Sequence, residues 1–168
     1  MSATLVMMVV TNTVGCGGIK SLILLSITFE GRNEARRKLR KYMENKYTVI
    51  AEKLLVEHNI TVREYRKSMT GRAFIKERQI IVPHPTGKIS LLIFCHEVGH
   101  IVIGETKPRF LEEYLAEKWA MDYFHKIGLR VPRTYVARAK RYISYKVRQA
   151  KRQGLTKSLG QEVYHFIK

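Results

Sequence analysis

The sequence predicts an α+β fold, in which a small antiparallel or mixed sheet packs on a central helix and further helices follow. Three observations predict it. Lys88–Ile103 places apolar residues at helical spacing, without a proline or an internal turn pair. Two segments rich in β-branched and aromatic residues, Ile60–Tyr65 and Arg72–Val82, precede this helix. Two more segments with helical periodicity, Arg109–Ile127 and Val131–Gln153, follow it.

The chain has 168 residues, which is enough for one domain with a sizeable core. We expect this core in residues 31–130, followed by a basic helical extension, residues 131–168, that packs on it. Residues 1–30 are a separate apolar N-terminal segment. They lack the basic start of a signal peptide, and their apolar runs are too short to span a membrane.

Local signals predict where the remaining elements begin and end. Gly31–His58 is expected to be a helix that stops at Asn59. A turn at Lys76–Arg78 divides the segment Arg72–Val82 into two short strands. Pro132 is suited to the first turn of the helix expected at Val131–Gln153. Leu155–Ile167 is expected to form a short final helix.

The chain is strongly basic. It contains 31 Lys and Arg residues against 14 Asp and Glu residues, with a net charge of +17 and a pI near 10.1. Such a charge favours polyanionic partners, among which nucleic acid is the usual one. The candidate contacts are the basic helices at 32–46 and 131–152, with Arg138, Arg141 and Arg148 in the latter. The alternatives are an ordinary solvated face and, less strongly supported, an anionic membrane surface.

Cysteine usage indicates a reducing compartment. The two cysteines, Cys16 and Cys95, are too few for a disulfide framework. We expect Cys95 to be a core residue, and the protein to be cytoplasmic.

The central helix carries the motif His96-Glu97-x-x-His100. The two histidines lie one turn apart on one helical face, so both imidazoles can bind one metal ion. Glu97 emerges near the same site, where a metal-bound water would lie. The alternative is a core helix that contains two histidines by chance, but buried polar side chains without partners would destabilise such a helix.

A catalytic zinc site needs three protein ligands and one open position. Glu113 is the best third candidate, because it lies 13 residues after His100 on a helix that can return antiparallel to the first. Glu112, Glu117 and His125 are the alternates. Glu117 can instead hydrogen-bond to a histidine or to Glu113 and so orient that ligand without binding the metal itself. The competing interpretation of these carboxylates is an ordinary acidic helix face.

The segment HEVGH followed by Glu113-x-x-Ala116-Glu117-x-Trp119-Ala120 resembles the gluzincin pattern of the ImmA/IrrE family of metallopeptidases. The resemblance covers roughly Lys67–Gly128. It includes the strand with the sequence Gly71-Arg72-Ala73-Phe74 before the active helix. The family tends to have Asp or Asn where this chain has Glu117, and the spacing to Glu113 is short. SprT-like DNA-associated proteases are a second resemblance. They use a third histidine, for which His125 is the only nearby candidate.

The ImmA/IrrE resemblance implies a minimal zincin-like domain that binds one Zn²⁺ through His96, His100 and Glu113. It implies a metallo-endopeptidase that hydrolyses a protein or peptide by a zinc-activated water, with Glu97 as general base. The strand before the active helix would be the edge strand that pairs with substrate, at Ile80, Ile81 and Val82. Candidates for supporting the ligands or the transition state are Glu117, Tyr114, Tyr123, His125 and Arg72. The alternative function is a zincin-fold protein that binds nucleic acid through its basic helices.

Overall fold

The structure is a computed structural model that describes residues 36–37, 46–154 and 160–168. The chain divides into two compact units, Met1–Tyr42 and Met43–Lys168. The predicted apolar segment 1–30 lies outside the described residues, as does most of the basic segment 32–46. The second unit contains residues 43–130 of the expected core and the whole expected C-terminal extension, and the following paragraphs describe it.

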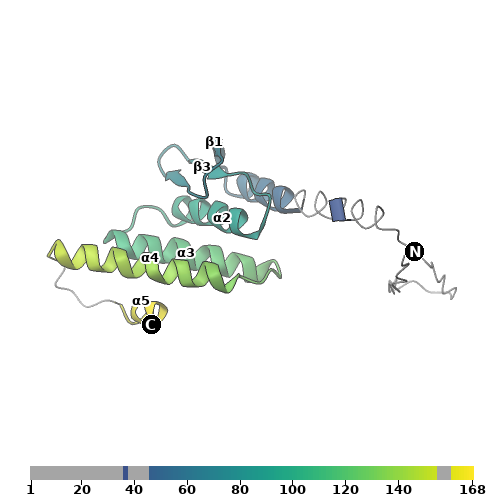
Figure 1. The fold of residues 1–168 in the computed structure, drawn as a ribbon. Helices are drawn as coiled ribbons and strands as arrows, with labels where there is room; N and C mark the ends of the chain where they lie inside the picture. Colours follow the sequence, from purple (N-terminus) through teal and green to yellow (C-terminus); the bar gives the residue numbers. More distant parts are fainter. Residues whose placement is uncertain (1–35, 38–45, 155–159) are drawn as a thin grey trace, which may run out of the picture. The chain divides into compact units, whose positions relative to one another are not determined.

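The described residues form an α+β fold with a small mixed sheet (Figure 1). Residues 46–57 are helical, and the chain turns at Asn59 in the left-handed conformation, φ 49°, which supports the predicted helix stop. The strands β1 (Thr61–Arg66), β2 (Arg72–Phe74) and β3 (Gln79–Pro83) follow. The turn between β2 and β3 lies where the sequence predicts it.

The strand order of the sheet is β1-β3-β2, with β1 parallel to β3 and β2 antiparallel to it. The prediction that Ile80, Ile81 and Val82 form an edge strand is therefore wrong, because β3 is the central strand. All three residues are buried. A continuous apolar run of this kind is typical of a strand covered on both faces, whereas an edge strand usually alternates. In the described part of the chain, β2 is the edge strand next to the HEVGH helix.

Four helices follow the sheet: α2 (Lys88–Ile103), α3 (Arg109–Lys126), α4 (Arg133–Arg152) and α5 (Gln161–Ile167). α2 contacts both β2 and β3 on one side and α3 on the other, and α4 packs on α3 (Figure 1). α2 is buried on most sides, which explains why its sequence is apolar almost throughout. The described residues contain no helix with the length and hydropathy that crossing a membrane requires.

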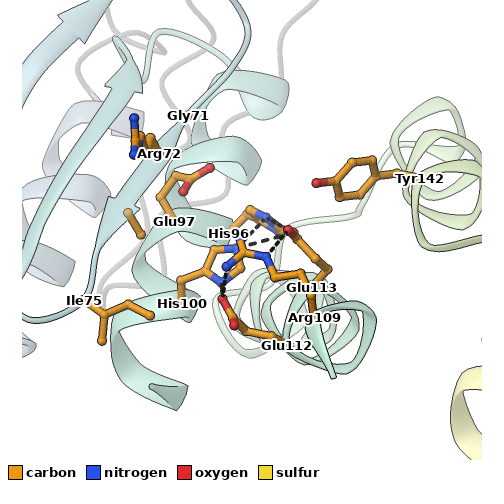
Figure 2. Close-up of a pocket in the computed structure, with 11 residues that line it drawn as sticks. Gly71, Arg72, Ile75, His96, Glu97, His100, Arg109, Glu112, Glu113 and Tyr142 are labelled. Atoms are coloured by element: carbon orange, nitrogen blue, oxygen red, sulfur yellow. Dashed lines mark hydrogen bonds and ion pairs between the residues drawn. The ribbon is translucent and has the colours of Figure 1, made fainter. Parts of the chain in front are cut away.

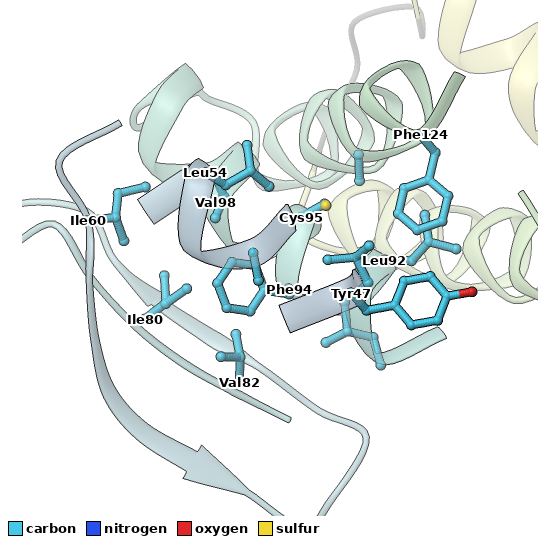
Figure 3. Packing of buried hydrophobic residues seen from close by; sticks show 14 of the residues in the cluster. Tyr47, Leu54, Ile60, Ile80, Val82, Leu92, Phe94, Cys95, Val98 and Phe124 are labelled. Carbon is cyan, nitrogen blue, oxygen red and sulfur yellow. The ribbon is translucent and has the colours of Figure 1, made fainter. Parts of the chain in front are cut away.

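One buried cluster joins the helical residues 46–57, the sheet, α2 and α3 (Figure 3). Leu54, Ile80, Phe94 and Phe124 are fully buried in it. Cys95 is also fully buried, as the sequence predicts. A second cluster joins α3, α4 and α5 through Phe110, Tyr114, Ile143, Val147 and Val163.

Gly99 sets how closely α2 and α3 approach. A Cβ atom at this position would lie 3.1 Å from the carbonyl oxygen of Ala116. A larger side chain in α2 would therefore hold the two helices further apart. The close approach brings the first turns of α3, including Glu113, against the histidines of α2.

Candidate metal centre

Three side chains from two helices converge on one point (Figure 2). His96 and His100 come from successive turns of α2, and Glu113 comes from α3. The Nε2 atoms of the two histidines are 3.1 Å apart, and each lies 3.5 Å from Oε2 of Glu113. Among the described residues these three are close enough to hold one metal ion.

The spacing of these atoms fits a tetrahedral ion. Zinc bonds histidine nitrogen and carboxylate oxygen at about 2.0 to 2.2 Å, so two ligand atoms of a tetrahedron are separated by about 3.3 to 3.6 Å. The three observed separations, 3.1, 3.5 and 3.5 Å, lie close to this range. The donor set of two imidazoles and one carboxylate is also one that zinc accepts.

Two further glutamates face the outer nitrogens of the histidine rings. Oε1 of Glu112 lies 3.0 Å from Nδ1 of His100, and Oε1 of Glu117 lies 3.5 Å from Nδ1 of His96. These are ion-pair distances, since neither Nδ1 atom makes an aligned hydrogen bond. The buried hydroxyl of Tyr135 donates a 2.8 Å hydrogen bond to the other oxygen of Glu117.

Carboxylates in this position fix the tautomer of a ligand histidine and direct Nε2 toward the metal. Glu112 and Glu117 lie beside the Nδ1 atoms of the rings, whereas Glu113 lies beside the Nε2 atoms. Of the three glutamates that the sequence offers as a third ligand, Glu113 is therefore the one near both Nε2 atoms.

Arg109 and Lys146 lie on the far side of the Glu113 carboxylate. Nε of Arg109 donates a 3.0 Å hydrogen bond to Oε1 of Glu113, and Nη1 donates a 2.8 Å bond to Oε1 of Glu112. Nζ of Lys146 lies 3.9 Å from the same Oε1 of Glu113. The cations thus hold Oε1 and leave Oε2 directed at the histidines.

The charges of the His96 and Glu113 side chains influence each other strongly. Burial by itself would lower the pKa of His96, but hydrogen bonds to Glu113 and Glu117 outweigh it and raise the pKa to about 10. Burial would raise the pKa of Glu113, but His100 and His96 outweigh it and hold this pKa far below its usual range. Without a metal, the site therefore favours an imidazolium beside a carboxylate.

Glu97 is buried in the same pocket, and burial raises the pKa of its carboxyl group. The backbone just before β2 passes directly beside it at Gly71. A Cβ atom at Gly71 would lie only 2.5 Å from both Cγ and Oε1 of Glu97. The absence of a side chain at this position leaves the space that the glutamate occupies.

The pocket that contains Glu97 and the three metal-ligand candidates has a volume of about 280 Å³ (Figure 2). Its walls are the residues around β2, including Arg72 and Ala73, and the ring of Tyr142 from α4. Two neighbouring pockets share part of these walls and extend along β2, from Thr70 at one end to Glu77 at the other. Arg72 is thus one predicted candidate that does line the pocket.

Three other predicted candidates lie elsewhere. The hydroxyl of Tyr114 donates a 3.4 Å hydrogen bond to Glu162, Tyr123 stacks on Trp119, and His125 is exposed. None of the three lines the pocket around His96. The reason is helical geometry, since they point about 80° to 120° away from Glu113 around the axis of α3.

Tyr142 is a site residue that sequence reasoning missed. The apolar stripe of α4 consists of the buried residues Tyr135, Ala139, Ile143 and Val147, and Tyr142 is the neighbour of fully buried Ile143. Tyr142 sits at the margin of the stripe and faces the pocket (Figure 2). Burial and the nearby Glu113 raise the pKa of its hydroxyl, which remains protonated at neutral pH.

No protein-family model, no curated protein and no solved structure matches this chain. The function proposed below therefore rests on the geometry of the site.

Proposed function

We propose that this protein is a zinc-dependent metallo-endopeptidase. The observation that carries the proposal is the triangle formed by Nε2 of His96, Nε2 of His100 and Oε2 of Glu113, with its sides of 3.1, 3.5 and 3.5 Å. A buried glutamate and an edge strand lie beside this triangle in one pocket. A metal site, a base and a place for an extended chain are the parts that peptide hydrolysis by a metal-activated water requires.

The ligands are held in a form suited to zinc. Glu112 and Glu117 face the Nδ1 atoms of the histidines, and with a metal in place of the imidazolium proton they would direct the Nε2 lone pairs toward it. Arg109 engages the outer oxygen of Glu113 and turns the inner oxygen toward the same point. When bound, zinc would lower the pKa of a water to about 7 and polarise the carbonyl of a peptide bond.

Glu97 is the proposed general base. Its buried position raises the pKa of its carboxyl group, which makes it a better proton acceptor than an exposed glutamate. It would accept a proton from the attacking water and deliver it to the leaving amine. Because Gly71 has no side chain, the Glu97 side chain can lie directly against the backbone that leads into β2.

Tyr142 is the proposed donor to the oxygen that becomes negatively charged. Its ring forms part of the pocket wall, and its hydroxyl retains its proton at neutral pH. A hydrogen-bond donor placed where charge develops stabilises the transition state. Arg72, which also lines the pocket, is the second candidate for this contact.

The substrate would pair with β2. This strand is hydrogen-bonded to β3 on one side, and among the described residues no strand pairs with its other side. Extended peptides add to free strand edges through main-chain hydrogen bonds. The order of the parts, with the edge strand before HEVGH and the glutamate-bearing helix after it, supports the proposed relationship to ImmA/IrrE-type metallopeptidases.

The test is cleavage of a peptide library by the zinc-loaded full chain, with the products read by mass spectrometry. We expect Glu97→Gln to retain zinc and to lower the cleavage rate by about 10²- to 10⁴-fold, which is the usual contribution of a general base. His125→Ala, a change at an exposed residue outside the pocket, is the matched control and should cleave normally. Cleavage by Glu97→Gln at the wild-type rate would refute the proposed mechanism.

A further inference from the structure

The exposed face of α4 is a row of arginines. Arg138, Arg141, Arg148 and Arg152 are all exposed, and at about 100° per residue they lie within an arc of about 80°. The row extends over about 21 Å of helix. The buried residues of α4 lie on its opposite side, packed on α3 and α5: Tyr135, Ala139, Ile143 and Val147.

The four arginines have no acidic partner in the part of the chain that the structure describes. α4 contains no Asp or Glu. Among the ion pairs of the described residues, none involves Arg138, Arg141, Arg148 or Arg152. Like charges on one helix face repel one another, and a polyanion that binds there removes this repulsion.

The metal centre makes the rest of the protein more basic than the composition suggests. Four of the 14 acidic residues, Glu97, Glu112, Glu113 and Glu117, are buried around the histidines. This leaves 10 acidic residues elsewhere in the chain against 31 Lys and Arg. The acidic residues elsewhere in the chain are therefore too few to balance its Lys and Arg residues. A partner of high negative charge could supply the missing negative charge at the α4 face.

The shape of the face favours duplex DNA over other polyanions. An α-helix fits the major groove of B-form DNA, which is about 12 Å wide, whereas the major groove of duplex RNA is too deep and narrow. Single strands are usually bound in grooves that track the backbone, whereas Arg141, Arg148 and Arg152 line none of the pockets along β2. A membrane would require a free apolar face, but the aliphatic residues Ile143 and Val147 of α4 are already buried.

We infer that the arginine row of α4 is a binding surface for the phosphate backbone of duplex DNA. Exposed Tyr145 lies within the row and adds a donor for phosphate. Arg138 and Tyr142 also line the neighbouring pocket on the Thr70 side, which Glu97 lines as well. A duplex on α4 would therefore run beside the proposed active site, although its binding requires neither zinc nor catalysis.

The test is a fluorescence anisotropy titration of the full chain with a labelled duplex of mixed sequence, repeated over a range of salt concentrations. The variant is Arg141→Gln/Arg148→Gln/Arg152→Gln, whose residues line none of the pockets along β2. The control is Lys53→Gln/Lys67→Gln/Lys126→Gln, at exposed positions outside α4. Both variants lose three charges, from +17 to +14.

We expect the arginine variant to bind the duplex at least about tenfold more weakly, and to reduce the slope of log affinity against log salt by about 3. The lysine control should change the affinity by less than about threefold. His96→Ala protein should bind DNA like the wild type, which separates this inference from the proposed peptidase.

Three results would overturn the inference. One is equal weakening in the two triple variants, which would mean that net charge alone is responsible. Another is the absence of duplex binding by the wild type. The third is tighter binding to single-stranded DNA, to duplex RNA or to phosphatidylglycerol vesicles than to the DNA duplex.

Discussion

At the scale of single residues, spacing along one helix predicts contacts well, and contacts between helices are harder to predict. His96, Glu97 and His100 could be read from the sequence because helical periodicity fixes their relative directions. The distance between Glu113 and the histidines depends on how α3 packs on α2, which no local pattern contains. Tyr142 comes from a third helix and was missed for the same reason.

Gly71→Ala tests the position of the proposed base. The added Cβ would overlap Cγ and Oε1 of buried Glu97, which must then turn away from the pocket. Since Gly71 has no positive φ, the effect is one of space and not of backbone strain. We expect the rate of peptide cleavage to fall by about 10²-fold or more, the contribution of a general base, while zinc content is unchanged.

Gly87→Ala is the matched control, because a Cβ at Gly87 meets no atom within 4 Å. It should cleave at close to the wild-type rate. Full activity in Gly71→Ala would show that Glu97 does not act from the position that the structure assigns to it.

At the scale of elements, the sequence predicts helix ends better than strand order. The observed α2 has the predicted bounds, since Gly87 and Gly104 flank an uninterrupted apolar helix. The order β1-β3-β2 depends on pairing between segments that are distant in the chain, and β3 was therefore misplaced at the edge. The run Ile80–Val82 does contain a signal, because three consecutive apolar residues indicate burial on both faces.

Gly99→Val tests the packing of α2 on α3. The valine Cβ would lie 3.1 Å from the carbonyl oxygen of Ala116, and its two methyl groups need further room. Overpacking of this kind costs about 1 to 3 kcal/mol, which lowers Tm by about 3 to 10 °C. Separation of the helices should also weaken zinc binding, as measured by competition with a chromogenic chelator.

Ala137→Val, at an exposed position of α4, controls for the poor helix propensity of valine. It should leave both Tm and zinc affinity nearly unchanged. An unchanged zinc affinity in Gly99→Val would contradict the argument that this close approach positions Glu113.

At the scale of the whole molecule, the charge of the chain is divided between two regions. Buried acidic residues gather around His96 and His100, and arginines without an ion pair to any described residue gather on the exposed face of α4. Composition alone predicts a basic protein, but only the fold shows that four of the 14 acidic residues are withdrawn from the surface. The fold also shows that the basic helix α4 borders the pockets around Glu97, whereas the sequence predicts only that this helix packs on the core.

The central claim is that His96, His100 and Glu113 hold one zinc ion, and metal analysis of the purified full chain tests it most directly. After loading with zinc and gel filtration, the wild type should contain about one zinc per chain, as expected of a three-ligand site. Glu113→Gln should contain much less, while Glu105→Gln, at an exposed position outside the triangle, should match the wild type. A wild type without zinc, or a Glu113→Gln variant that retains a full equivalent, would contradict the account.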